Sequence, residues 1–420
     1  MLSRRTPRQG RRPGYGLAVL PQHERVSRFV AACLPAMWML TVGPGYAASW
    51  PLGSWSAEYD KRGLFLESAD GRFALHPQLR FQTRYSNPFD ADPRSVEAVE
   101  NPPGGDLRLQ RSRIKLGGHA FAPWLKFYTE MEFRDTRLLD LRLSLEKFRT
   151  VNLRIGQWKP EYNRERRDSS GTLQFAERSI VNRPFTLDRQ PGAMLYGRLF
   201  PGTRHDLSWW TGLFTGSGRS TRPDGGRPLW LARLQWNLFG RVLEFSQSDV
   251  TWRAEPAASL AIAYAQNRSR YTRFSSAGGG ELDGFSEGED DQYALRQAMV
   301  EAALQWQGLS FQAELHGKRV RDRLNGGTTK LWGSYLQAGL FPGRFFPKVP
   351  APLELAVRAA AVDPDTSEGN DMQHELTAAA NWFFNGHRNK LTFDVSWIQV
   401  DEPGDSASDV RFRFQWDVSF

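Results

Sequence analysis

Basic side chains recur at every second position in several segments of this 420-residue chain. Arg111, Arg113 and Lys115 follow this spacing, and Arg80 and Arg84 lie four apart with Gln82 between them. Residues two apart share one face of a β-strand, so each set would form a row of cations. Such rows can replace the water around a small oxyanion, and guanidinium groups match its oxygens in pairs. The chemistry that these residues favour is therefore recognition of small anions such as phosphate.

Catalytic motifs are missing from the sequence. It contains no phosphate-binding loop of nucleotide enzymes, no dinucleotide fingerprint and no His-x-x-x-His metal pair. Strand alternation also sets no histidine beside an outward-facing serine, as an outer-membrane phospholipase would need. We therefore predict a protein that is not an enzyme, with no catalytic residue, no metal site and no cofactor.

The N-terminal residues 1–48 have the features of a secretory signal. Arg25 and Arg28 precede an apolar run over 29–42, and small residues follow at 45–48. The only cysteine lies in this segment, so a disulfide scaffold is excluded. Of the formal net charge of +9, this segment carries seven Arg and one Glu, which leaves +3 for the rest. We therefore predict no nucleic-acid partner.

Alternation of apolar and polar residues dominates the remaining chain. Every second residue from Val410 to Phe420 is apolar, and the residues between them are polar. The chain has 27 Phe, 15 Trp and 11 Tyr, yet its mean hydropathy is only −0.54. No apolar run is long enough for a membrane helix, and strands with one lipid face and one wet face explain both properties. A soluble amphipathic sheet is the alternative.

The predicted fold class is all-β, a transmembrane antiparallel β-barrel over 72–420 that follows a short N-terminal segment over 49–71. Sixteen strands are expected, an even number as in single-chain bacterial barrels. They cover 72–85, 107–117, 124–134, 137–147, 150–158, 190–200, 205–214, 228–238, 258–268, 294–306, 309–320, 329–342, 352–362, 372–384, 390–400 and 409–420. The long periplasmic connection 239–257 leaves open an additional hairpin and a total of eighteen strands.

The third outer connection, residues 159–189, is long, and a short helix is expected at Leu173–Val181. In sixteen-strand pores this connection typically folds into the lumen and narrows it, and we expect the same here. An ordered surface loop is the alternative.

Alternation also predicts which charged residues line the pore. Leu79 and Phe81 would face lipid, which turns Arg80 inward, and the other strands are assigned in the same way. The candidate pore-lining, substrate-binding residues are Arg80, Arg84, Arg111, Arg113, Lys115, Lys126, Glu130, Arg142 and Arg154 on the strands, and Lys159, Arg164, Arg166 and Arg167 in the third outer connection. Alternatively, each charge pairs across the wall and has no role in transport.

The chain resembles the phosphate-selective porin O and P family over about 70–420. The resemblance rests on the segments Leu109–Gly118, Leu153–Pro160, Phe175–Ser179 followed by Asp188–Gly192, Asn381–Asn385, and the terminal strand. It implies an outer-membrane barrel, a homotrimer in the best-known members, and passage of phosphate through a basic constriction. Arg80 and Arg111 are the positions that match the constriction. Those members have two adjacent arginines on the second strand, and here Gln110 replaces one of them.

We therefore expect a bacterial outer-membrane porin that gives passive, anion-favouring diffusion of phosphate or similar oxyanions. The expected partners are outer-membrane lipid, small anions, two further copies of the chain, and the barrel assembly machinery, which would read the terminal strand ending in Phe420. The alternatives are a general non-specific diffusion porin and a structural or adhesive barrel without selective transport.

Overall fold

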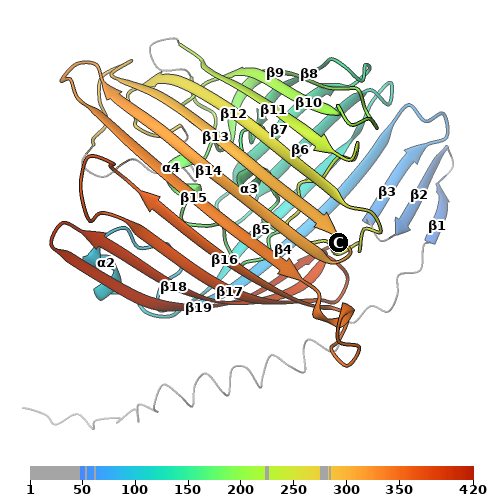
Figure 1. Ribbon diagram of the computed structural model, residues 1–420. Coiled ribbons are helices and arrows are strands. Elements are labelled where there is room, and N and C mark those ends of the chain that lie inside the picture. Colours follow the sequence, from blue (N-terminus) through green and yellow to red (C-terminus); the bar gives the residue numbers. More distant parts are fainter. Residues whose placement is uncertain (1–47, 53, 61–62, 223–226, 275–281, 283–284) are drawn as a thin grey trace, which may run out of the picture. The chain divides into compact units, whose positions relative to one another are not determined.

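The computed structural model describes residues 48–420 except 53, 61–62, 223–226, 275–281 and 283–284 (Figure 1). The signal predicted for 1–48 therefore lies outside the described residues, apart from Ala48. Among the described residues, no helix combines the length and the apolar composition needed to cross a membrane.

Sixteen antiparallel strands form a closed barrel, as the alternation predicted (Figure 1). They are β4 (Ala74–Asn87), β5 (Asp106–His119), β6 (Leu125–Glu132), β7 (Arg137–Leu145), β8 (Asn152–Trp158), β9 (Gln190–Leu199), β10 (Leu207–Phe214), β11 (Leu229–Leu238), β12 (Ala257–Ser269), β13 (Tyr293–Trp306), β14 (Leu309–Asp322), β15 (Thr328–Leu340), β16 (Leu353–Asp363), β17 (Gln373–Phe383), β18 (Asn389–Glu402) and β19 (Asp405–Ser419). Each strand pairs with the next in sequence, from β4–β5 through β8–β9 to β18–β19. The connection 239–257 contains no strand before β12 begins at Ala257, so the alternative of eighteen barrel strands is wrong.

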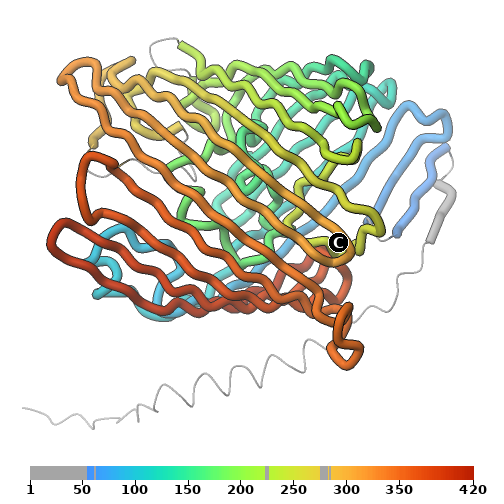
Figure 2. The backbone as a smooth tube through the Cα atoms, in the orientation of Figure 1, coloured from blue at the N-terminus to red at the C-terminus, as the bar shows by residue number. Residues whose placement is uncertain are grey.

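The barrel closes where β19 pairs with β4, and we call this pairing the seam. Figure 2 shows the blue and red parts of the chain meeting there. The last residue takes part: Leu79 N donates to the carbonyl of Phe420 at 2.8 Å, and Phe420 N donates to the carbonyl of Leu79 at 3.0 Å. Closure leaves no unpaired strand edge in the membrane, where unpaired backbone groups would be costly.

Three short strands precede the barrel in the segment 49–71, for which the sequence predicted none. They are β1 (Ala48–Leu52), β2 (Trp55–Asp60) and β3 (Gly63–Ser68), joined as successive antiparallel pairs. β3 pairs with the start of β4 through Leu66 and Leu75. They therefore extend the sheet from the periplasmic end of β4.

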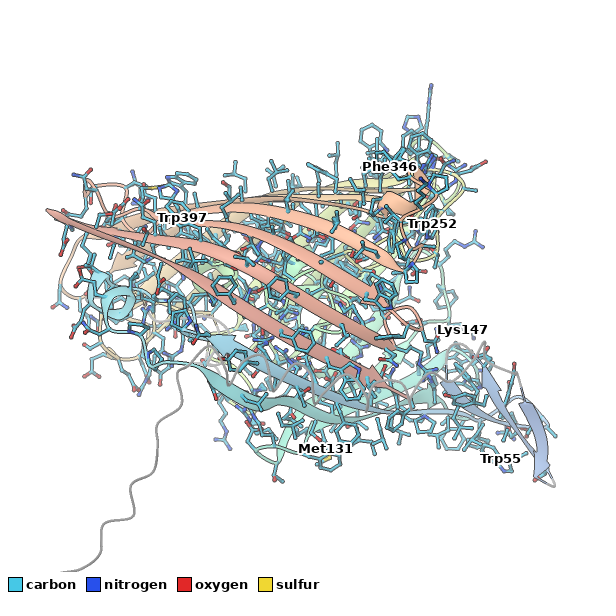
Figure 3. All side chains as sticks on the ribbon, turned by 90° about the horizontal axis from the view of Figure 1, so that it is seen from below. Trp55, Met131, Lys147, Trp252, Phe346 and Trp397 are labelled. Atoms are coloured by element: carbon cyan, nitrogen blue, oxygen red, sulfur yellow. The ribbon has the colours of Figure 1, made fainter. Side chains whose placement is uncertain are left out.

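The barrel wall is apolar outside, and its inner face carries polar side chains together with a buried apolar cluster that includes Phe185, Phe214 and Leu331. Leu79 and Phe81 are 37% and 41% exposed, whereas Arg80 between them is 2% exposed. Met131 and Trp397, labelled in Figure 3, belong to the same exposed apolar face on different sides of the barrel. This alternation is the one expected for a wall between lipid and a wet lumen.

The helices in the described part of the chain are short. They are α2 (Val96–Glu100), α3 (Arg164–Arg167), α4 (Asn182–Phe185) and the 3₁₀ turn η2 (Pro342–Arg344). The helix predicted at Leu173–Val181 is wrong, because that stretch is irregular. Its backbone groups bond to wall side chains instead, as described below.

Candidate functional site

Carboxylates of the barrel wall hold the third outer connection through its backbone. Glu301 of β13 accepts from Arg164 N at 2.9 Å, and Glu314 of β14 accepts from Glu165 N at 2.7 Å. Asp394 of β18 accepts from the backbone N–H of Ala176 at 2.8 Å, and Glu375 of β17 accepts from that of Ile180 at 3.0 Å. Buried N–H groups need acceptors, and ionised acceptors make the stronger bonds. The wall therefore supplies the bonds that a helix would otherwise make within itself.

Arginines of β4 and β5 bind the same connection from the seam. Arg80 Nη1 donates to Ser170 Oγ at 2.8 Å, and Arg84 Nη2 donates to the carbonyl of Ala176 at 2.5 Å. Arg111 Nη2 donates to Glu177 Oε2 at 2.8 Å. Inward-facing side chains from β4, β5, β13, β14, β17 and β18 thus converge on residues 164–180.

The long periplasmic connection 239–257 also contacts the third outer connection. The carbonyl of Glu244 accepts from Arg164 Nη1 at 2.7 Å. Gln247 N donates to the carbonyl of Thr172 at 3.1 Å, and Gln247 Oε1 accepts from Gln174 N at 2.9 Å. The connection 239–257, whose length left open an additional hairpin, thus forms hydrogen bonds that help to hold the third outer connection.

Most of the predicted pore-lining cations are paired with carboxylates. Nine of the twelve have a carboxylate oxygen within 4.0 Å: Arg80 with Asp417, Arg84 with Asp90 and Glu177, Arg111 with Glu177, Arg113 with Glu130 and Glu132, Lys126 with Glu146, Arg154 with Glu161, Arg164 with Glu301, Arg166 with Asp188, and Arg167 with Glu161. A paired cation exerts a weaker field on a passing ion than a free one. The predicted row of free guanidinium groups is therefore largely a network of ion pairs.

Three predicted cations remain without a carboxylate within 4.0 Å among the described residues: Lys115, Arg142 and Lys159. The Arg142 guanidinium lies over the ring of Tyr128 at 4.7 Å. Lys159 Nζ donates to the backbone carbonyls of Arg166 at 3.1 Å and Asp168 at 3.5 Å. Among the described residues, no carboxylate lies close enough to these three groups to offset their charge.

Lys159 lies in a strongly positive environment. Burial lowers the pKa of its ammonium group well below the usual range, and Arg178, Arg189 and Arg166 lower it further. Asp188 opposes the shift but does not reverse it. An anion beside Lys159 would favour its charged form and would lie near three guanidinium groups.

Two carboxyl groups in the third outer connection differ in protonation. Burial raises the pKa of Glu161, but Arg154 and Arg167 outweigh it and lower the value to about 2. For Asp168, burial prevails over Arg164 and Arg178 and raises the pKa to about 7. The side-chain oxygens of Asp168 accept no hydrogen bond within the described chain. Near pH 7 the connection therefore gains or loses one negative charge at Asp168.

The reasoning from sequence missed the anchoring role of the second half of the barrel. Four carboxylates, Glu301, Glu314, Glu375 and Asp394, face inward there and bind the third outer connection. The available signal was a carboxylate on the polar face of five of the six strands in 293–402, all except β15. Its partners could not be read from the same pattern.

The match to known proteins covers most of the barrel. The family model for phosphate-selective porin O and P matches residues 83–415, and no curated protein matches the chain. Among solved structures, OmpT of Vibrio cholerae superposes with a TM-score of 0.51 at 8% identity, over 83% of this chain and 98% of its own. The outer-membrane channel DcaP of Acinetobacter baumannii gives 0.51 at 11% identity, over 84% and 99%.

An anion-selective porin from Comamonas acidovorans superposes with a TM-score of 0.50 at 12% identity, over 83% of this chain and all of its own. At such identities these structures indicate the fold alone. Family and fold together point to a channel rather than an enzyme. The chain belongs to the phosphate-selective porin O and P family and is a multi-pass β-barrel of the bacterial outer membrane.

Proposed function

We propose that this porin gives passive, anion-favouring diffusion of phosphate or similar small oxyanions. In this proposal the third outer connection lies in the lumen and narrows it. The support is its set of bonds to inward-facing side chains from both halves of the wall. Ions would then pass the unpaired cations Lys115, Arg142 and Lys159.

The observation that carries the proposal is the environment of Lys159. Its ammonium group has only carbonyl partners among the described residues, and Arg166, Arg178 and Arg189 are close enough to lower its pKa. Selectivity depends on the charge at the narrowest point of a pore rather than on the total charge. A positive point of this kind raises a barrier to cations and favours anions. The neighbouring wall carboxylates offset this positive field only in part, because they are already paired with cations or hydrogen-bonded.

A general diffusion porin is the second candidate. The observation that favours it is the pairing of nine of the twelve predicted cations with carboxylates. A lumen in which positive and negative charges balance would pass small solutes with little dependence on the sign of their charge. The two candidates differ in the expected ion selectivity and in the effect of phosphate.

Single-channel recording in a planar bilayer separates them. In a tenfold KCl gradient the wild type should show a reversal potential that favours chloride, and added phosphate should reduce the chloride current. Lys159→Gln should lower the anion preference by up to about fivefold, since an anion in the pore favours the charged form of Lys159 and one charge near a constriction contributes on the order of 1 kcal/mol. Arg142→Gln should act in the same direction.

The matched control is Lys348→Gln. Lys348 is exposed in the connection between β15 and β16, so its loss removes one charge without touching the proposed constriction. Cation preference in the wild type would refute the proposal. An unchanged reversal potential in both Lys159→Gln and Arg142→Gln would favour the general porin.

Assembly adds two proposals that rest on the resemblance. We propose a homotrimer, which native mass measurement in detergent would test and a stable monomer would exclude. We also propose that the barrel assembly machinery reads the last strand, ending in Phe420.

A further inference from the structure

Five basic residues form a cluster on the outer surface of the barrel, at the outer ends of β12 to β15. Strand alternation turns them away from the lumen: exposed Arg296 lies between buried Leu295 and Gln297, and buried Val320 lies between two exposed arginines. We call this set the outer basic cluster; its members are Arg268, Arg296, Arg319, Arg321 and Lys330. The cluster is thus separate from the charges of the lumen.

Strand register brings three of these cations into one row. Arg296 lies directly opposite Arg319 on the next strand, and Arg319 lies directly opposite Lys330 on the strand after that. Like charges directly opposite each other destabilise a sheet. In the part of the chain that the structure describes, no carboxylate oxygen lies within 4.0 Å of any member of the cluster. An anion from outside the chain would relieve this repulsion.

The row lies just outside the apolar band. One step nearer the membrane centre, the register aligns Tyr264, Ala298, Gly317 and Trp332 across the same four strands. Tyrosine and tryptophan mark the membrane interface in outer-membrane barrels. The next step consists of exposed apolar side chains such as Ile262, Val300 and Leu315. The basic row is therefore at the level of the lipid headgroups in the outer leaflet.

The cluster borders a recess of about 390 Å³. Six arginines line this recess: Arg227, Arg268, Arg296, Arg319, Arg321 and Arg323. Two of them have partners in Asp291, whose carboxylate pairs with Arg227 at 3.0 Å and whose carbonyl accepts from Arg323 Nη1 at 2.9 Å. No Asp or Glu is among the lining residues.

We propose that the outer basic cluster binds the phosphate groups of a phosphorylated glycolipid of the outer leaflet, of the lipid A type. Guanidinium groups bind phosphate oxygens in pairs, and several together suit a headgroup with more than one phosphate. The acyl chains of such a lipid would lie along Ile262, Val300 and Leu315, two register steps from the basic row toward the membrane centre. This apolar track is why a lipid fits better than free phosphate. The proposal rests on the outer-membrane location and does not depend on pore selectivity.

Native mass spectrometry of the folded barrel in detergent tests it, with bisphosphorylated lipid A and the same lipid lacking both phosphates as probes. The wild type should bind the bisphosphorylated form at least about tenfold more tightly. The double change Arg296→Gln/Arg319→Gln should remove this preference and leave binding of the dephosphorylated lipid unchanged. Each charge near an anionic lipid is worth roughly fivefold in affinity.

The control is Arg134→Gln/Arg137→Gln in the hairpin between β6 and β7, also at an outer end of the barrel. It removes the same number of charges, but both arginines there pair with Asp135, so lipid binding should stay at the wild-type level. If Arg296→Gln/Arg319→Gln does not assemble, Arg319→Gln alone should lose at least about threefold in affinity for bisphosphorylated lipid A.

Three outcomes would overturn the proposal. The first is equal binding of both lipids by the wild type, or no change in the Gln variants. The second is equally tight binding of the deacylated bisphosphorylated headgroup, which would assign the cluster to free phosphate compounds. The third is a changed number of chains per complex with lipid binding unaltered, which would assign the cluster to a protein partner.

Discussion

Arg80 and Asp417 form a buried ion pair across the seam, with Arg80 Nε donating to Asp417 Oδ1 at 2.9 Å. Both side chains are almost fully buried, and the neighbouring Gln82 donates to the same carboxylate at 2.6 Å. The pair joins the first barrel strand to the last. Arg80 is one of the two residues that the family resemblance predicts at the constriction, and its ion pair bridges the seam.

Arg80→Gln should destabilise the barrel by about 3–5 kcal/mol, because it leaves the Asp417 carboxylate buried without its main partner. The loss should appear as a lower urea midpoint and a lower temperature for the shift of the folded band on a gel. Arg108→Gln is the control: Arg108 is 43% exposed and pairs with Asp106, which is 38% exposed, and more distantly with Asp90, which keeps Arg84 as a closer partner, so a change below about 1 kcal/mol is expected. Wild-type stability in Arg80→Gln would show that the pair does not support closure.

Asp168 should make selectivity depend on pH. Burial raises the pKa of Asp168 to about 7, so this carboxyl group is neutral at pH 5 and charged at pH 9. The negative charge gained on raising the pH should lower the anion preference of the pore, as measured by reversal potentials between pH 5 and 9. Asp168→Asn should keep the low-pH preference throughout. An equal pH response in both proteins would contradict this.

The same shift should make the third outer connection less stable at high pH. The folded pKa of Asp168 lies above its ordinary value of 3.8, so its contribution to stability is fully present below about pH 4 and is lost as pH rises through about 7. Limited proteolysis of the folded barrel should therefore cut within 159–189 faster at pH 9 than at pH 5. Asp168→Asn should show a smaller difference between the two pH values.

The wall carboxylates should control how firmly the third outer connection is held. Glu314 accepts from Glu165 N at 2.7 Å and from Asn163 Nδ2 at 2.9 Å. Glu314→Ala leaves both donors buried without this acceptor, at a cost of about 1–3 kcal/mol for each. Conductance should rise and current noise should increase in single-channel records. Asp322→Ala, at the outer end of β14 where the carboxylate accepts from Asn325 N in the following turn, should keep the wild-type record. A wild-type record for Glu314→Ala as well would exclude an anchoring role.

All sixteen barrel strands could be predicted because alternation is a local property of each segment. Local patterns carry no information about strand register. The partner of Arg80, Asp417, lies 337 residues away and could therefore not be predicted. One irregularity was also missed. The pairing of β4 with β5 shifts between Gln82 and Thr83 and leaves Gln110 as an extra residue. This bulge turns Leu109 outward and Arg111 inward although both have odd numbers.

The helix predicted at Leu173–Val181 was wrong for a tertiary reason. Two backbone N–H groups in this stretch donate to Asp394 and Glu375, which lie about 200 residues further along the chain. Propensity within the segment carries no information about such acceptors. The pairing of the pore-lining cations was unpredictable for the same reason, since it joins the connection to distant strands.

Phe420 combines two properties that one pair of variants can separate. Its backbone exchanges two hydrogen bonds with Leu79, while its side chain is 48% exposed, with its ring centre 6.1 Å from that of Phe81. Deleting Phe420 removes both the seam bonds and the aromatic ring, whereas Phe420→Ala removes only the ring.

If assembly depends on recognition of the terminal aromatic, both variants should lose most of the heat-modifiable barrel in outer-membrane fractions, and Phe420→Tyr should restore it. If only the deletion loses it, the two backbone bonds at the seam matter and the ring does not. Normal yields from both variants would exclude any role of this residue in assembly.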